Sequence, residues 1–244
     1  MTGCSMTTSA GHDSFHETRW SLVVNARHSP EHLEELLRAY WPPVYSSIRA
    51  RGYSIHDAAD LTQAFLTHVL LGRDMVDIAD PTRGRFRAFI KTALQRYLVD
   101  EHRREHGRSG DRGVTFLPDV SVLADTMDQP EDDPSEAFDR QWATTVLNAA
   151  LERVEADYRK RGQVVAWRAF EMRVLGPVKG TGPSPALPEI ASAVGESDTA
   201  KLSKLIHGVK QSLRLALRDV VAETVAKPDD IDPELRDLMG ALGM

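Results

Sequence analysis

Residues 86–98 read Phe86-Arg87-Ala88-Phe89-Ile90-Lys91-Thr92-Ala93-Leu94-Gln95-Arg96-Tyr97-Leu98. The apolar residues of this stretch recur at spacings of three and four, which places them on one side of a helix. The members of that side are Phe86, Phe89, Ile90, Ala93, Leu94, Tyr97 and Leu98. The stretch therefore predicts an amphipathic helix that packs against other helices.

Positive charge is concentrated on and around this predicted helix. Between residues 83 and 108, eight Lys and Arg side chains stand against three acids, in a chain whose net charge is −6. Such a local excess is typical of a surface that binds a polyanion. Charge alone leaves a solvated helix face as the alternative.

A second helical pattern precedes the first. With Ala58 at the centre of its apolar side, Leu61, Phe65 and Val69 follow at helical spacing, while the opposite side carries Asp60, Gln63 and Thr67. One side of this helix is expected to pack, and the other is available to a partner.

Three segments carry a resemblance to a known family. They are Asp57-Ala58-Ala59-Asp60-Leu61-Thr62-Gln63-Ala64-Phe65, Arg87-Ala88-Phe89-Ile90 and Asp100-Glu101-His102-Arg103-Arg104. Together they resemble region two of the extracytoplasmic-function (ECF) sigma factors of bacterial RNA polymerase, with matching order and spacing over about ninety residues. The segment Tyr40-Trp41-Pro42-Pro43-Val44-Tyr45 resembles the opening helix of the same domain. The resemblance implies a transcription initiation factor that directs core polymerase to promoter DNA.

The resemblance also assigns the polymerase-binding residues. Sigma domain two docks on a coiled coil of the largest polymerase subunit through a polar, acidic helix face, which corresponds here to Asp57, Asp60 and Gln63. Ala59 and Ala64 stand where the family commonly has Glu, and each lost charge pair weakens such an interface by about 0.2 to 1 kcal/mol. The interpretation requires that Asp60 and Gln63 are not sealed in the interior.

Phosphorylation offers one way to restore the missing charge. Thr62 and Thr67 lie in the same predicted helix, and a phosphate adds roughly −1.5 to −2 charges. A Ser/Thr kinase is therefore a possible partner under the resemblance, as is an anti-sigma factor. The alternative for Thr62 is a packed side chain, because it lies near the apolar side.

The loop Asp80-Pro81-Thr82-Arg83-Gly84-Arg85 and the helix after it correspond to the part of the family that melts the minus-ten element. Melting requires a site that favours single strands, built from cations and pockets for unstacked bases. The candidates are Arg83, Arg85, Arg87, Lys91, Gln95 and Arg96. The family often has Asn at the position of Arg96, so base preference does not carry over there.

The C-terminal half predicts a helix-turn-helix. Helical periodicity begins at Ser135, and a second helix over 164–175 is expected to end at Gly176-Pro177. A short apolar pattern from Leu187 to Val194, Gly195 and then a longer helix form the expected unit.

The second helix of this unit is expected to meet DNA. It resembles region four of the same sigma factors, which reads the minus-thirty-five element, and the candidate contacts are Thr199, Lys201, Ser203, Lys204 and His207. The turn is one residue longer than usual. The family's late arginines are thinned to Gly208-Val209-Lys210-Gln211, which predicts weaker phosphate binding.

We therefore predict an all-α chain of 244 residues with two small helical domains. The expected divisions are a disordered leader at 1–16, sigma region two at 17–106, a flexible linker at 107–134, sigma region four at 135–225 and an acidic tail at 226–244. The tail stripe Leu235, Leu238, Met239 and Leu242 predicts a docking helix or a frayed end. No apolar run approaches the roughly 18 residues that span a bilayer, which predicts a cytoplasmic location without membrane contact.

Local expectations concern the prolines and one histidine pair. Pro30-Glu31 suits a helix start, whereas Pro42-Pro43 predicts a kink or two abutting helices. His102 and His106 have a spacing that can bind a metal, but the adjacent arginines repel a cation. We therefore expect no metal, no cofactor and no enzymatic activity.

Two alternatives remain open from the sequence. One is a helix-turn-helix regulator that binds duplex DNA without polymerase. The other is a helical adaptor that uses Asp60 and Gln63 to bind protein and never touches DNA.

Overall fold

The computed structural model describes residues 29–71, 85–107, 133–178, 180, 182–225 and 227–243. Every regular element in these ranges is helical, so the predicted all-α class is confirmed. The elements are α2 (Pro30–Arg49), α3 (Ile55–Leu71), α5 (Phe86–Gly107), α7 (Pro134–Lys160), α8 (Val164–Phe170), the π-helical turn η2 (Glu171–Leu175), α9 (Gly176–Val178), α10 (Leu187–Val194), α11 (Thr199–Ala222), the 3-10 turn η3 (Pro228–Asp230) and α12 (Ile231–Ala241). The predictions for the leader, for Arg83 and for most of the linker fall outside the described residues.

Helices α2, α3 and α5 pack through the apolar sides that the sequence predicts. Tyr40 and Trp41 from α2, Phe65 from α3 and Phe86 from α5 are buried in one cluster. The rings of Tyr40 and Phe86 meet edge to face with centroids 5.1 Å apart. The predicted α5 stripe is confirmed, because Phe86, Ile90, Leu94 and Leu98 are buried and Phe89, Ala93 and Tyr97 are partly buried.

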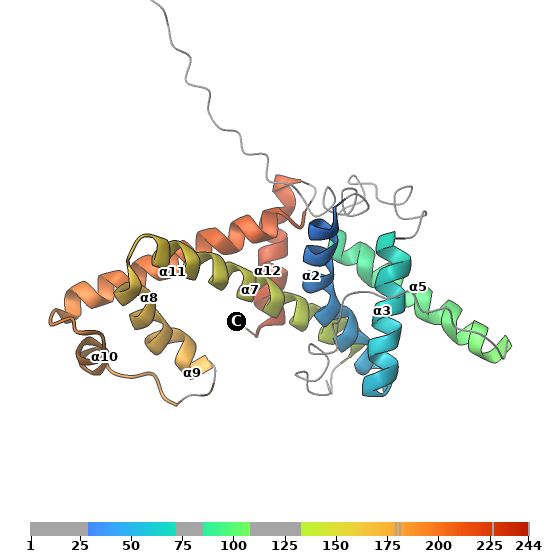
Figure 1. The fold of residues 1–244 in the computed structure, drawn as a ribbon, viewed down its shortest axis with the longest axis horizontal. Helices are drawn as coiled ribbons and strands as arrows, with labels where there is room; N and C mark the ends of the chain where they lie inside the picture. Colours follow the sequence, from blue (N-terminus) through green and yellow to red (C-terminus); the bar gives the residue numbers. More distant parts are fainter. Residues whose placement is uncertain are drawn as a thin grey trace, which may run out of the picture.

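Helices α7 and α11 lie side by side and connect the two ends of the molecule (Figure 1). The first half of α7 adds Phe138 and Trp142 to the cluster of α2, α3 and α5. Its second half packs with α8, α10 and α11 around Phe170 and Ile190 in a second cluster. The change from one cluster to the other therefore falls inside α7, and the segment 135–225 contributes to both.

Pro30 begins α2 as expected, while the other prolines correct part of the local expectation. Helix α2 is one continuous helix with Pro42 and Pro43 inside it, not two abutting helices. Gly176-Pro177 does not end the second helix either, because helical structure runs through η2 into α9. Pro177 cannot donate to the Arg173 carbonyl four residues earlier. The Ser184 hydroxyl donates to that carbonyl instead, at 2.9 Å.

The C-terminal segment forms a docked helix, which settles the choice between docking and fraying. Leu238 of α12 is fully buried in the first cluster, Leu235 and Leu242 pack against it, and Met239 is 40% exposed.

Of the helices described, none is both long and apolar enough to cross a membrane.

Candidate functional site

The side of α3 that faces away from the core carries the predicted polymerase-binding residues. Asp57 and Asp60 are exposed and Gln63 is partly exposed. The requirement that Asp60 and Gln63 lie outside the interior is therefore met. Ala64 is also exposed on this side, so a longer acidic side chain at that position would reach solvent.

Asp57 also has a local structural role that the sequence analysis missed. Its backbone N–H donates to the Ser54 hydroxyl at 3.1 Å, and the hydroxyl donates to the Asp57 carboxylate at 2.7 Å. The Ser54 hydroxyl thus caps one N-terminal amide of α3, and the Asp57 carboxylate holds that hydroxyl in place. Asp60 takes no part in this exchange, so its carboxylate is the stronger candidate for binding a partner.

The two threonines proposed for phosphorylation present buried hydroxyls. Thr62 is 0% exposed, and its hydroxyl donates to the Ala58 carbonyl at 2.6 Å. The Thr67 hydroxyl oxygen is also buried. Neither oxygen is open to phosphate transfer in this conformation, which corrects the expectation for Thr62 in favour of the packed alternative.

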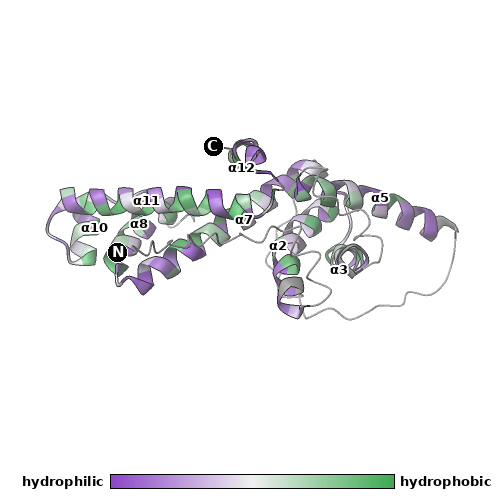
Figure 2. Ribbon diagram, turned by 90° about the horizontal axis from the view of Figure 1, so that it is seen from above, coloured by the Kyte–Doolittle hydropathy of each residue, from purple (hydrophilic) through white to green (hydrophobic). Residues whose placement is uncertain are grey.

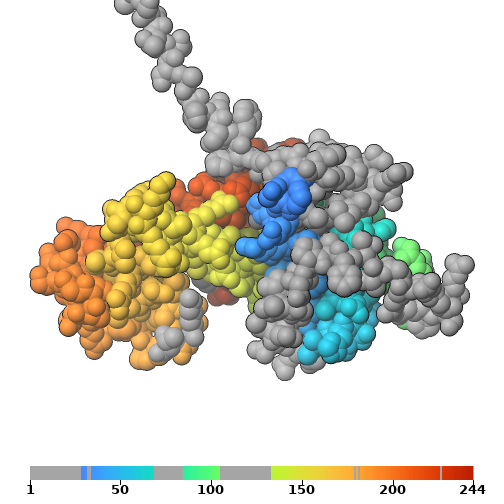
Figure 3. Space-filling model, viewed as in Figure 1, coloured from blue at the N-terminus to red at the C-terminus, as the bar shows by residue number. Residues whose placement is uncertain are grey.

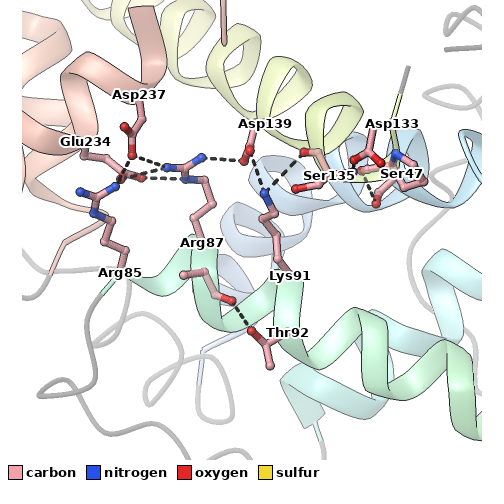
Figure 4. Close-up of polar contacts among 12 residues, drawn as sticks. Ser47, Arg85, Arg87, Lys91, Thr92, Asp133, Ser135, Asp139, Glu234 and Asp237 are labelled. Atoms are coloured by element: carbon pink, nitrogen blue, oxygen red, sulfur yellow. Dashed lines mark hydrogen bonds and ion pairs between the residues drawn. The ribbon is translucent and has the colours of Figure 1, made fainter. Parts of the chain in front are cut away.

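The cations at the start of α5 form ion pairs with carboxylates from α7 and α12 (Figure 4). Arg85 pairs with Glu234, with Nη1 and Oε2 2.8 Å apart, and with Asp237. Lys91 pairs with Asp139, with Nζ and Oδ2 2.7 Å apart. Arg85 and Lys91, two of the predicted DNA-binding cations, are therefore neutralised by carboxylates from distant parts of the chain. Arg87, which lies between them in the sequence, is a third.

Arg87 is the centre of this network. Its Nε donates to Glu234 Oε1 at 2.9 Å and its Nη1 to Asp139 Oδ1 at 2.6 Å, and its guanidinium carbon lies 4.5 Å from the centroid of the Trp142 ring. Burial by itself lowers the pKa of this guanidinium, but the hydrogen bonds and charges of Glu234 and Asp139 outweigh burial and raise the pKa. Arg87 is thus a buried ion-pair residue here, and a DNA contact through it requires a rearrangement.

A groove of about 930 Å³ lies beside the network, between α2, α5, α7 and α12. Its cationic lining residues are Arg51, Arg85, Arg87, Lys91, Arg140 and Arg236, and its acidic ones are Glu136, Asp139 and Asp237. Burial lowers the pKa of Arg51, which Asp133 partly offsets. Because six cationic side chains stand against three acidic ones, the groove keeps a surplus of positive charge even with the ion pairs formed.

The remaining α5 candidates are open to solvent. Gln95 and Arg96 are exposed. Beyond them α5 ends in a hydrophilic segment that projects from the other described helices (Figure 2). Arg103 and Arg104 in this segment are exposed and form ion pairs within the helix, with Asp100 and Glu101.

The predicted helix-turn-helix has its expected elements. Helix α10 ends at Gly195, whose φ of 73° is left-handed and suits glycine. Asp198 then caps α11, because its carboxylate accepts from the backbone N–H groups of Ala200 at 2.8 Å and Lys201 at 3.1 Å. Ile190 of α10 and Leu202 of α11 are both buried in the second cluster. The left-handed Gly195 thus ends α10 before the turn, and the Asp198 cap begins α11 after it.

Helix α11 presents its predicted DNA-contacting residues to solvent. Thr199, Lys201, Ser203, Lys204 and His207 are all exposed. Helix α10 and the start of α11 form one end of the molecule (Figure 3). Lys201 also pairs with Glu196, with Nζ and Oε2 2.6 Å apart. This hydrogen bond lowers the pKa of the Glu196 carboxyl and raises that of Lys201.

Metal binding has no support within the described part of the chain. No group of three or more His, Cys, Asp and Glu side chains is close enough there to hold an ion. The His106 side chain lies outside the described side chains, and His102 is exposed.

Comparison of the chain with family models, with curated proteins and with solved structures found no match. The likeness to sigma factors accordingly rests on the motifs and on the residues that carry them.

Proposed function

We propose that this chain is a transcription initiation factor of the ECF sigma type, which binds core RNA polymerase and directs it to promoters. The observation that supports this most is the division of α3 into two sides. Its apolar side, with Ala58 and Phe65, is buried against α2 and α5, while Asp60 is exposed. A rigid helix with an outward carboxylate suits docking on a basic partner surface.

The helix-turn-helix supplies the second function that an initiation factor requires. Exposed Lys201 and Lys204 offer phosphate contacts at the start of α11, and Thr199 and Ser203 offer donors and acceptors to base edges. Under the proposal, α11 reads the minus-thirty-five element in duplex DNA. The candidate side chains on and beside α5 bind the melted strand of the minus-ten element.

Run-off transcription with reconstituted core polymerase on genomic fragments tests the proposal. Discrete start sites that appear only when the chain is added are the expected result. No transcript above that of core polymerase, on fragments covering the genome, would contradict it.

A helix-turn-helix regulator that acts without polymerase is the second candidate. One observation favours it: the α11 candidates are all exposed, including Lys201 with its partner Glu196, whereas Arg85, Arg87 and Lys91 are buried or partly buried in ion pairs. A mobility shift separates the candidates, because the regulator binds an operator duplex alone. In that assay Lys204→Gln lowers duplex affinity, while Lys160→Gln, an exposed lysine at the end of α7, leaves it unchanged.

A further inference from the structure

Helix α12 places one of its sides against the predicted DNA-melting cations. Glu234 and Leu238 are one helical turn apart and both are 0% exposed. Asp237 lies on the same side and pairs with Arg85 and Arg87. Hydrophobic burial and ion pairing thus hold the same helix at the same place.

The charges at this contact balance one for one. Three cations at or just before the start of α5, Arg85, Arg87 and Lys91, meet three carboxylates, Glu234, Asp237 and Asp139. Two of these three carboxylates belong to α12. A DNA phosphate that approaches these cations must therefore displace acids that already neutralise them.

We propose that α12 is an intramolecular competitor, whose carboxylates occupy the cations through which α5 binds single-stranded DNA, so that release of α12 activates this site. The inference rests on the proposed function, since it concerns the same cations. It adds that the chain carries its own restraint on DNA binding.

The geometry suits a contact that can be released. Helix α12 has 11 residues, and isolated helices of this length are marginal in water. Its docking therefore depends on Leu238 and on the ion pairs. Asp237 is 48% exposed at its side chain and Arg85 is 26% exposed, so a competing polyanion can reach this edge of the network without prior unfolding.

Fluorescence anisotropy of the full chain with a labelled single-stranded oligonucleotide tests the inference. Asp237→Asn removes one competing charge from a half-exposed position, so the fold is retained, and affinity is expected to rise about two- to fivefold. Glu234→Gln combined with Asp237→Asn is expected to raise it further. Asp232→Asn is the matched control, because Asp232 is on the same helix but pairs with Arg218 of α11.

Hydrogen exchange of α12 gives a readout that does not depend on DNA. Faster exchange of α12 amides in the double variant, together with tighter oligonucleotide binding, supports the inference. Unchanged oligonucleotide affinity in both variants, with polymerase binding intact, overturns the inference and leaves the proposed function standing. Absence of both DNA and polymerase binding in every variant overturns both.

Discussion

Arg87 and Glu234 lie 147 residues apart in the sequence and form a buried, hydrogen-bonded ion pair, with Nε and Oε1 2.9 Å apart. The Arg87 side chain is 10% exposed and that of Glu234 is 1% exposed. This pair connects α5 to α12, and so connects the predicted DNA-melting residues to the C-terminal end of the chain.

Removal of Arg87 should destabilise the fold strongly. Arg87→Gln removes the more deeply buried of the two cations that pair with Glu234 and leaves Arg85 as its partner, and loss of a buried pair costs up to about 3–5 kcal/mol. Urea unfolding followed by circular dichroism measures the change. Arg96→Gln, at an exposed position of the same helix, should stay within about 0.5 kcal/mol of wild type. Equal losses in the two variants would show that the Arg87 network carries no special stability.

A charge at Thr62 should destabilise the fold and should not strengthen polymerase binding as a phosphate on an exposed residue would. Because Thr62 is 0% exposed and its hydroxyl donates to Ala58, Thr62→Asp should lower the free energy of unfolding by at least about 2 kcal/mol. Ala64→Asp, on the exposed side of the same helix, serves as the control and should be nearly neutral. A stable Thr62→Asp variant with increased polymerase binding would refute the buried assignment.

Restoration of a carboxylate on the outer side of α3 should strengthen polymerase binding. Ala64 is exposed beside Asp60, so Ala64→Glu should add about 0.2 to 1 kcal/mol of binding free energy. Titration of core polymerase with labelled chain measures this. Ala156→Glu, at an exposed position of α7, controls for net charge. If the two variants gain equally, the effect does not come from the α3 surface.

The Glu196–Lys201 pair predicts a pH dependence in the helix-turn-helix. The pKa of the Glu196 carboxyl is lowered from 4.5 by the hydrogen bond from Lys201. The stabilisation is therefore present at pH values above 4.5 and is lost as the pH falls through the lowered pKa. Carboxyl titration by NMR should show a lower pKa for Glu196 in wild type than in Lys201→Gln, in which the backbone hydrogen bonds from Ser197 and Asp198 remain. An identical titration in both proteins would show that the pair does not form in solution.

Helix positions and buried sides were predictable because they depend on local periodicity. The stripe from Phe86 to Leu98, the end of α10 at Gly195 and the exposed residues of α11 all follow from spacings within one element. Proline effects were less predictable. Helical structure continues through Pro177, and the Arg173 carbonyl, to which Pro177 cannot donate, accepts from Ser184 outside the helix.

The occupied state of Arg85 and Arg87 could not be read from α5. Their partners Asp139, Glu234 and Asp237 come from α7 and α12, and pairing across such separations is decided by tertiary packing. The available signal was the acidic tail with an apolar stripe, which predicts a docking helix but not the surface it binds. The cations were thus identified from sequence, while their neutralisation was not.

The affinity of the full chain for core RNA polymerase tests the central claim most directly. The account predicts a one-to-one complex that Asp60→Arg weakens by at least about tenfold, because charge reversal replaces attraction with repulsion. Glu152→Arg, at an exposed position of α7, should bind like wild type. A wild-type chain that forms no complex with core polymerase, or an Asp60→Arg variant that binds as well as wild type, would contradict the account.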